Sequence, residues 1–211
     1  MCSHYEAPAP ERVAETFDVE PFEQGKLDLY PGYTGPFIRR AEHVDDESSV
    51  LMEALQGAFG LIPTWSKDTK IVRSTYNCRS ETASQKPSFR TAWRKAQHCI
   101  IPAAAIYEPD WRTGKSIATR IARADGELLG IAGLWERWRD PVTSEDLHSF
   151  TMLTINADDH PFMRNYHKPQ DEKRMVVILP RGLYGDWLNA GAGDSMEFMR
   201  QYPADRMTVA M

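Results

Sequence analysis

The sequence predicts an α+β fold: a mainly antiparallel, barrel-like β-sheet with flanking helices, in a single domain spanning residues 1–211. Three observations support this prediction. From His98 onward, apolar runs of strand length alternate with short turns. One of these turns, Asp125-Gly126, has the composition typical of a β-hairpin. The length and the 42% hydrophobic content suffice for one domain with a substantial core.

Local patterns define the elements of the first half. Val13 and Phe17 stand four residues apart on one face of a short helix, and Pro87 lies near the first turn of a second helix. In chain order, the expected elements are a helix over 8–19, a turn-rich loop over 28–36, strands over 37–38 and 50–63, an irregular polar loop over 74–82 and a helix over 86–97.

The second half is predicted to be mostly strands, because its apolar runs are short and separated by turn residues. The expected strands lie at 98–102, 103–109, 116–124, 128–138, 148–157 and 174–180, and two closing helices lie at 183–189 and 195–201.

Charge is unevenly distributed along the chain. The net charge is -5, which argues against a protein that coats nucleic acid indiscriminately. Residues 65–98 nevertheless hold eight basic and two acidic side chains. Such a run is most often a solvated helical face, and a phosphate-binding surface is the alternative interpretation.

Several classes of protein are disfavoured. No apolar run approaches the roughly 18 residues of a membrane span, and the first residues do not resemble a secretory signal. Three widely spaced cysteines favour free thiols in a reducing compartment, so we expect a cytoplasmic protein. We expect no metal and no cofactor, because metal-ligand spacings, phosphate-binding loops and the GxSxG motif are all missing.

Cys2 is the first candidate for chemistry. Removal of Met1 would leave an N-terminal cysteine whose α-amine and thiol stand on adjacent carbons. The amine has an ordinary pKa of about 7.7–8.0, so a neutral fraction exists at neutral pH. An aldehyde would form a Schiff base with this amine, and the thiol would then close a thiazolidine ring. The alternative is a frayed terminal residue without a role.

Other polar residues stand in suggestive positions. Glu108 ends an apolar run, where burial would raise its pKa and suit it to proton transfer, although an exposed edge-strand glutamate is an equal alternative. His167 lies in a polar loop and is either exposed or a proton shuttle. Asn77 and Arg79 suit the orientation of a nucleophile and the binding of phosphate. Trp65 is either a core residue or a platform for a base.

Together these segments resemble the SOS-response-associated peptidase (SRAP) family of abasic-site processing proteins. The resemblance is carried by MCSH, by GLIPTW followed by YNCRSET, by HCIIPAAAIYEP, and by FTMLTINAD with HKPQDEKRMVVILP. It implies a compact α+β fold and a covalent thiazolidine link between Cys2 and the ring-opened sugar aldehyde of an abasic site. The implied partner is single-stranded DNA, including junctions with duplex, and we expect neither a membrane nor an obligate protein partner. Localisation to the nucleoid would accompany binding to damaged DNA.

The resemblance also assigns roles to residues. Cys2 is the nucleophile, Asn77 orients its amine, and Glu108 and His167 transfer protons. The family name further implies autocatalytic removal of Met1. His4 stands where the family often has a phosphate-binding arginine, and an insertion separates His167 from the following Arg-Met pair. The residues expected to contact DNA are Trp65, Arg79, Arg73, Lys70, His4, Thr154 and Asn156.

Two other functions remain open on the sequence alone. One is a cysteine peptidase that uses Cys2 with His167 and Asn77, which requires a thiolate close to an imidazole. The other is a non-catalytic module that binds single strands, for which binding would depend on salt but not on Cys2.

Overall fold

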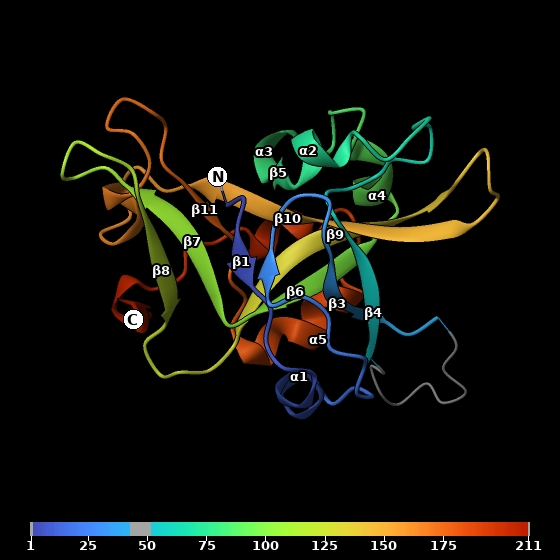
Figure 1. The fold of residues 1–211 in the computed structure, drawn as a ribbon, viewed down its shortest axis with the longest axis horizontal. Coiled ribbons are helices and arrows are strands. Elements are labelled where there is room, and N and C mark those ends of the chain that lie inside the picture. Colours follow the sequence, from blue (N-terminus) through green and yellow to red (C-terminus); the bar gives the residue numbers. More distant parts are fainter. Residues whose placement is uncertain (1, 43–51, 211) are drawn as a thin grey trace.

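A closed five-stranded barrel forms the centre of the computed structural model, which describes residues 2–42 and 52–210 (Figure 1). Around the barrel the strand order is β10-β4-β3-β6-β9, and β9 pairs with β10 to close it. The strands are β3 (Thr34–Arg40), β4 (Met52–Phe59), β6 (His98–Ala103), β9 (Leu129–Arg139) and β10 (Asp146–Asn156).

The barrel is mainly antiparallel, as predicted, but β10 also makes two parallel pairings. It pairs with the end of β4 and then with the short strand β5 (Asn77–Arg79), where Met152 stands opposite Asn77. On its other side, β10 pairs with β11 (Arg174–Val176). The far end of β10 is therefore flanked by two short segments whose side chains carry polar groups.

A second sheet connects the start of the chain to the barrel. Its order is β12-β8-β7-β1-β2, and β1 lies antiparallel to β7 with Tyr5 opposite Ile106. Because of this register, the residues that precede β1 lie beside the second half of β7. The strands are β1 (Tyr5–Glu6), β2 (Asp28–Leu29), β7 (Ala105–Asp110), β8 (Ile117–Arg123) and β12 (Met207–Val209).

Short helices cover two opposite ends of the barrel (Figure 1). At the lower end in that view are α1 (Pro10–Phe17) and α5 (Tyr184–Asn189), where Phe17 and Tyr184 stack with ring centroids 5.0 Å apart. At the upper end are α2 (Val72–Thr75), α3 (Ser80–Ala83) and α4 (Arg90–Arg94). Four 3₁₀ turns lie at η1 (Met163–Asn165), η2 (Arg181–Leu183), η3 (Ser195–Phe198) and η4 (Ala204–Arg206).

The core fills the barrel with apolar side chains from facing strands. In β9, residues 129–134 are all buried, as expected for a strand covered on both faces. Gly133 is required by close packing, because a Cβ there would lie 2.3 Å from the Ile101 side chain and 2.5 Å from the Thr151 carbonyl oxygen.

Most of the predicted elements are confirmed in position, with the following corrections. The Asp125-Gly126 turn does not make a β-hairpin, because β8 pairs with β7 and β12 whereas β9 belongs to the barrel. The helix expected over 195–201 is only the 3₁₀ turn η3, and the strands expected over 50–63 and 174–180 end at Phe59 and Val176.

The loop expected over 74–82 is wrong, because it contains β5 and α3. The loop expected over 28–36 includes β2 and the start of β3. The helix expected over 86–97 is limited to α4, since Ala96 adopts a left-handed backbone conformation with φ of 50°. Residues 50 and 51 of the strand expected over 50–63 lie outside the described residues.

Within the described ranges, no helix combines the length and apolar character that crossing a membrane requires.

Candidate active site

Cys2 is held against the barrel by Asn77. The Asn77 Nδ2 atom donates a hydrogen bond of 2.6 Å to the backbone oxygen of Cys2, and Cys2 is only 1% exposed. The thiol of Cys2 donates to the backbone oxygen of His4 at 3.3 Å. The pairing of β5 with β10 fixes the position of Asn77, so two distant segments converge on residue 2.

The other half of the Asn77 amide is unsatisfied. Its Oδ1 atom is buried and has no hydrogen-bond partner among the described residues. A buried acceptor without a donor costs roughly 1–3 kcal/mol. An ordered water, an ion or a reacting group is the usual partner of such an atom.

Glu108 and His167 form a buried pair. His167 Nε2 lies 3.0 Å from Glu108 Oε2, and the side chains are 7% and 1% exposed. His167 adopts φ of 64°, a conformation that a non-glycine residue rarely occupies. Its backbone N–H donates to the Pro109 carbonyl oxygen at 2.8 Å, so the strained backbone is tied to the strand that carries Glu108.

Burial determines the protonation of this cluster. It raises the pKa of the Glu108 carboxyl to about 7 and lowers the pKa of His167 to about 4, with the charge of Lys173 contributing to the decrease. Burial also raises the pKa of the Cys2 thiol, and the nearby Glu108 carboxylate adds to that increase. At neutral pH the thiol and the imidazole are therefore uncharged, while Glu108 is divided between its two forms.

A buried arginine links the segments that support Asn77 and His167. Arg174, 3% exposed, forms two hydrogen bonds with Glu81 on α3, of 2.8 and 2.9 Å. It also contacts Glu172 at 2.9 Å and the backbone oxygen of Thr154 at 2.8 Å. This bidentate pair joins α3 to β11 across β10.

His4, expected to contact DNA, is engaged within the protein. Its ring stacks between Tyr30 and Tyr107, with centroid distances of 4.3 and 4.0 Å. Its Nε2 atom lies 2.8 Å from Asp28 Oδ1. The ring therefore anchors the start of β1, just beyond Cys2.

Three further predicted DNA contacts lie around Arg174. Arg79 is half exposed and pairs with Glu172 at 2.7 Å. Asn156 is exposed and donates to Asp158 at 2.8 Å and to Glu172 at 3.3 Å. Thr154 is 1% exposed and accepts a hydrogen bond from Arg174 at 3.2 Å. Thr154 thus supports the arginine and does not face solvent.

The remaining predicted contacts lie on an exposed basic face. We use this name for the eight exposed basic residues of 65–98: Lys67, Lys70, Arg73, Arg79, Lys86, Arg90, Arg94 and Lys95. Trp65 stands at its start, 55% exposed, with its indole N–H donating to the Pro87 carbonyl at 3.2 Å. Trp65 is therefore not a core residue. In Figure 1, α2, α3 and α4 of this segment lie on the side of the molecule where the chain begins.

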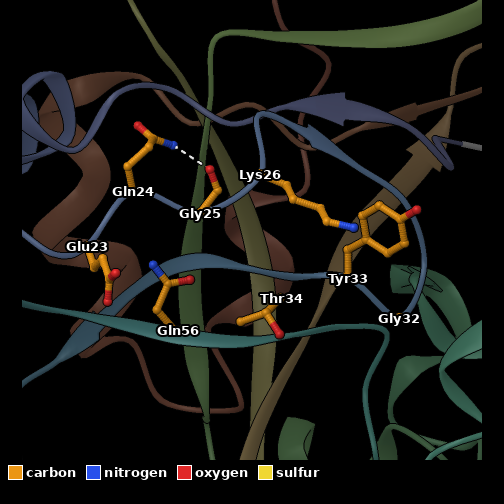
Figure 2. Close-up of a pocket in the computed structure, with 8 residues that line it drawn as sticks. All are labelled: Glu23, Gln24, Gly25, Lys26, Gly32, Tyr33, Thr34 and Gln56. Atoms are coloured by element: carbon orange, nitrogen blue, oxygen red, sulfur yellow. Dashed lines mark hydrogen bonds between the residues drawn. The ribbon is translucent and has the colours of Figure 1, made fainter.

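A pocket of about 530 Å³ lies apart from the cluster of Cys2, Asn77, Glu108 and His167 (Figure 2). It is bordered by the chain from Glu23 to Lys26 and by Tyr33, over whose ring the Lys26 ammonium lies at 4.0 Å. None of the predicted catalytic residues lines it. The cavity therefore gives no support to a catalytic role.

Among the described residues, no group of three or more His, Cys, Asp or Glu side chains is placed to hold a metal ion.

The structure adds residues that the sequence did not single out. Lys173 is 9% exposed, and its ammonium donates to the backbone oxygens of His167 and Lys168. Tyr30, Tyr107 and Asp28 hold His4 in place. Lys173 stands beside an arginine in a polar loop, so its sequence gives no indication that it is buried. The stacking of Tyr30 and Tyr107 on His4 joins segments that are distant in the sequence, so no local pattern predicts it.

Comparison with known proteins shows which family the sequence matches. The sequence model of the family described as "SOS response associated peptidase (SRAP)" matches residues 1–211. The abasic site processing protein YoqW of Bacillus subtilis (strain 168) is 32% identical over 202 residues, covering 92% of this chain and 84% of that protein. The abasic site processing protein HMCES of Gallus gallus is 28% identical over 164 residues, covering 66% and 48%.

Solved structures share the architecture. A crystal structure of a protein from Bordetella bronchiseptica is 51% identical, with a TM-score of 0.88, and the match covers 99% of this chain and 98% of that one. A protein from Bacteroides thetaiotaomicron, 23% identical, has the same fold, with a TM-score of 0.77 and coverage of 98% and 90%.

Proposed function

The chain belongs to the SRAP family, and from this membership and the cluster around Cys2 we propose that it processes abasic sites by covalent capture. After removal of Met1, the amine and thiol of Cys2 bond to the ring-opened sugar of an abasic site in single-stranded DNA. The names of its relatives, abasic site processing proteins, support the substrate.

One observation carries the proposal: Cys2 lies in a buried polar cluster suited to proton transfer. Asn77 binds the backbone of Cys2, and the unsatisfied Asn77 Oδ1 is an acceptor for a donor close by. The N–H of a freed α-amine on Cys2 is such a donor. Glu108 is close enough to influence the thiol pKa, so nitrogen, sulfur and a proton donor belong to one site.

The reaction balances without an added reactant. The neutral amine attacks the aldehyde carbon, and the former carbonyl oxygen takes up a proton to give a carbinolamine. Glu108 in its acid form gives a proton to this hydroxyl, which leaves as water, and the products are an iminium ion and the Glu108 carboxylate. The sulfur then bonds to the iminium carbon, the thiol proton passes to the Glu108 carboxylate, and the nitrogen keeps its N–H. The products are a thiazolidine and one water molecule.

Glu108 suits both proton transfers because its pKa lies near neutrality. In the first transfer it is an acid, and in the second it is a base. His167 fixes the carboxyl through the 3.0 Å hydrogen bond. Since the imidazole is neutral at pH 7, it holds the carboxyl by a hydrogen bond without adding a second buried charge.

A cysteine peptidase is less well supported. Such enzymes depend on a thiol whose pKa is lowered so that the thiolate is available. Burial and the Glu108 carboxylate instead raise the pKa of Cys2. Turnover of peptides in trans by protein that lacks Met1 would favour the peptidase after all.

The direct test is intact mass spectrometry before and after incubation with a single-stranded oligonucleotide that holds one abasic site. We expect a chain that begins at Cys2 and an adduct whose mass is the sum of protein and DNA less one water. The adduct should survive denaturing electrophoresis. Protein with a confirmed Cys2 terminus that forms no adduct would contradict the proposal.

Two variants separate the steps. Cys2→Ser retains the amine but loses the sulfur, so we expect an imine that borohydride traps and heat destroys. Asn77→Ala removes the support of the terminus and should slow capture at saturating DNA. If Cys2→Ser forms an adduct as durable as the wild type without borohydride, the thiazolidine is wrong.

A further inference from the structure

A basic pocket adjoins the catalytic cluster beside the β7–β8 loop and the loop before β11. Its volume is about 290 Å³, and His167 forms part of its wall. The other lining residues are Trp111, Arg112, Arg164, Asn165, Pro169 and Lys173.

The two basic regions lie on either side of the start of the chain. In Figure 1 the β7–β8 loop and the loop before β11, which supply this pocket, lie left of the N-terminus, whereas α2 and α4 lie to its right. Contacts agree with this view. Asp110 forms a β-bridge with Tyr166 on the pocket side, while Cys2 meets Asn77 on the other.

The pocket carries net positive charge. Arg112 is neutralised by Asp110, which it contacts at 2.6 Å. Arg164 is exposed, and its guanidinium makes no ion pair or hydrogen bond in the part of the chain that the structure describes. The buried Lys173 ammonium contacts only backbone oxygens among those same residues. The positive charges of Arg164 and Lys173 are therefore available to bind an anion. A buried ammonium such as that of Lys173 favours an anionic neighbour.

Trp111 adds an apolar surface to the same pocket. It is partly buried, and the Lys168 ammonium lies 5.4 Å from its ring centroid. Cations interleaved with an aromatic ring are typical of sites that bind a nucleotide in a single strand, where phosphate and base are recognised together.

We propose that this pocket binds the phosphate and base of a nucleotide on one side of the abasic site. This inference rests on the proposed function, because it places the captured sugar at Cys2. The strand then passes from the exposed basic face, across Cys2 and His167, into the pocket. The pocket therefore serves only one flank of the lesion.

The test uses binding without chemistry. Two fluorescent oligonucleotides carry a tetrahydrofuran spacer, which lacks the aldehyde, with nucleotides only on its 5′ side or only on its 3′ side. Anisotropy measures their affinity for the Met1-processed protein. For Arg164→Ala we expect a five- to ten-fold rise in Kd for one oligonucleotide and less than two-fold for the other. The salt slope for the affected oligonucleotide should fall by about 0.7.

Matched variants complete the design. Arg181→Ala removes an exposed arginine beside α1, at the opposite end of the barrel, and should change neither Kd. Arg164→Lys should restore most of the affinity, and Trp111→Ala should weaken the same oligonucleotide as Arg164→Ala. Equal effects of Arg164→Ala on both oligonucleotides, or none on either, would overturn the inference. Failure of wild type to form an adduct with true abasic DNA would instead reject the proposed function.

Discussion

At the scale of single residues, the site depends on one carboxyl kept away from water. Glu108 is 1% exposed and shares a hydrogen bond with a histidine that burial keeps neutral. Its pKa of about 7 allows it to donate and accept protons at the pH of the cell. The same burial destabilises the charged carboxylate. The environment that suits Glu108 to proton transfer therefore lowers the stability of the folded protein when the carboxyl is ionised.

The first prediction concerns the pH dependence of capture. Capture needs a neutral α-amine, whose ordinary pKa is about 7.7–8.0, and a protonated Glu108, whose pKa is about 7. We therefore expect a bell-shaped profile whose maximum lies between the two pKa values. Glu108→Gln should lower the maximal rate about 100-fold and abolish the alkaline limb. Single-turnover adduct formation between pH 5 and 9 measures both. An alkaline limb that persists in Glu108→Gln would show that another group titrates.

The second prediction concerns stability. Burial raises the pKa of Glu108 from 4.5 to about 7, so below pH 4.5 the carboxyl is protonated in both folded and unfolded chains. Between pH 4.5 and 7 only the unfolded chain ionises, and the folded state loses about 3 kcal/mol by pH 8. Glu108→Gln should therefore be more stable than wild type at pH 8.5 and gain little at pH 4.5. Urea denaturation at both values tests this, with the exposed Glu11→Gln as control.

At the scale of elements, short segments far apart in sequence are tied to one strand. β5 and β11 both pair with β10, and the Arg174–Glu81 pair joins them through α3. Because β5 carries Asn77 and the loop before β11 carries His167, this pair supports both sides of the catalytic cluster. The Arg174–Glu81 pair therefore positions the catalytic residues and also stabilises the fold.

The third prediction tests this link. Glu81→Gln removes the charge and the bidentate hydrogen bonding of the carboxylate that faces a buried guanidinium, whose other contacts are Glu172 and the backbone and hydroxyl oxygens of Thr154. We expect a loss of about 2 kcal/mol in the free energy of unfolding, and slower capture at saturating DNA. Glu172→Gln, which removes a single hydrogen bond to Arg174, should cost less. A Glu81→Gln protein as stable as wild type would show that the pair is incidental.

The elements also show what the sequence was able to predict. Strands with long apolar runs, such as β9 and β10, follow from their own residues. The loop expected around Asn77 is wrong because small polar residues carry no strand signal, and the pairing with β10 alone makes this segment a strand. Cys2 and Glu108 were named as candidates, but their proximity depends on the register of β1 against β7. Tertiary pairing of that kind leaves no local pattern.

At the scale of the whole molecule, an acidic protein presents a basic surface on the side where the chain begins (Figure 1). The net charge is -5, yet all eight basic residues of 65–98 are exposed. The negative charge of the rest of the chain reduces long-range attraction to undamaged nucleic acid. The basic face attracts phosphates only at short range, because salt screens its charges beyond about 10 Å. Affinity for DNA should therefore be moderate and sensitive to salt.

The last prediction follows from this distribution. Lys70 and Arg73 are exposed on the basic face and line one pocket, so each is placed to neutralise a phosphate of a bound single strand. Replacing both with glutamine should lower the slope of log K against log salt by about 1.4, because each phosphate contact on a single strand contributes about 0.7. The loss of affinity should be several-fold at 0.1 M salt and should shrink at higher salt, as screening removes the contribution of these charges. Anisotropy with an undamaged oligonucleotide measures the slope independently of capture. Arg181→Gln, beside α1, serves as the matched control. A double variant with the wild-type slope would mean that the strand avoids this face and that the charges of residues 65–98 only solvate the helices.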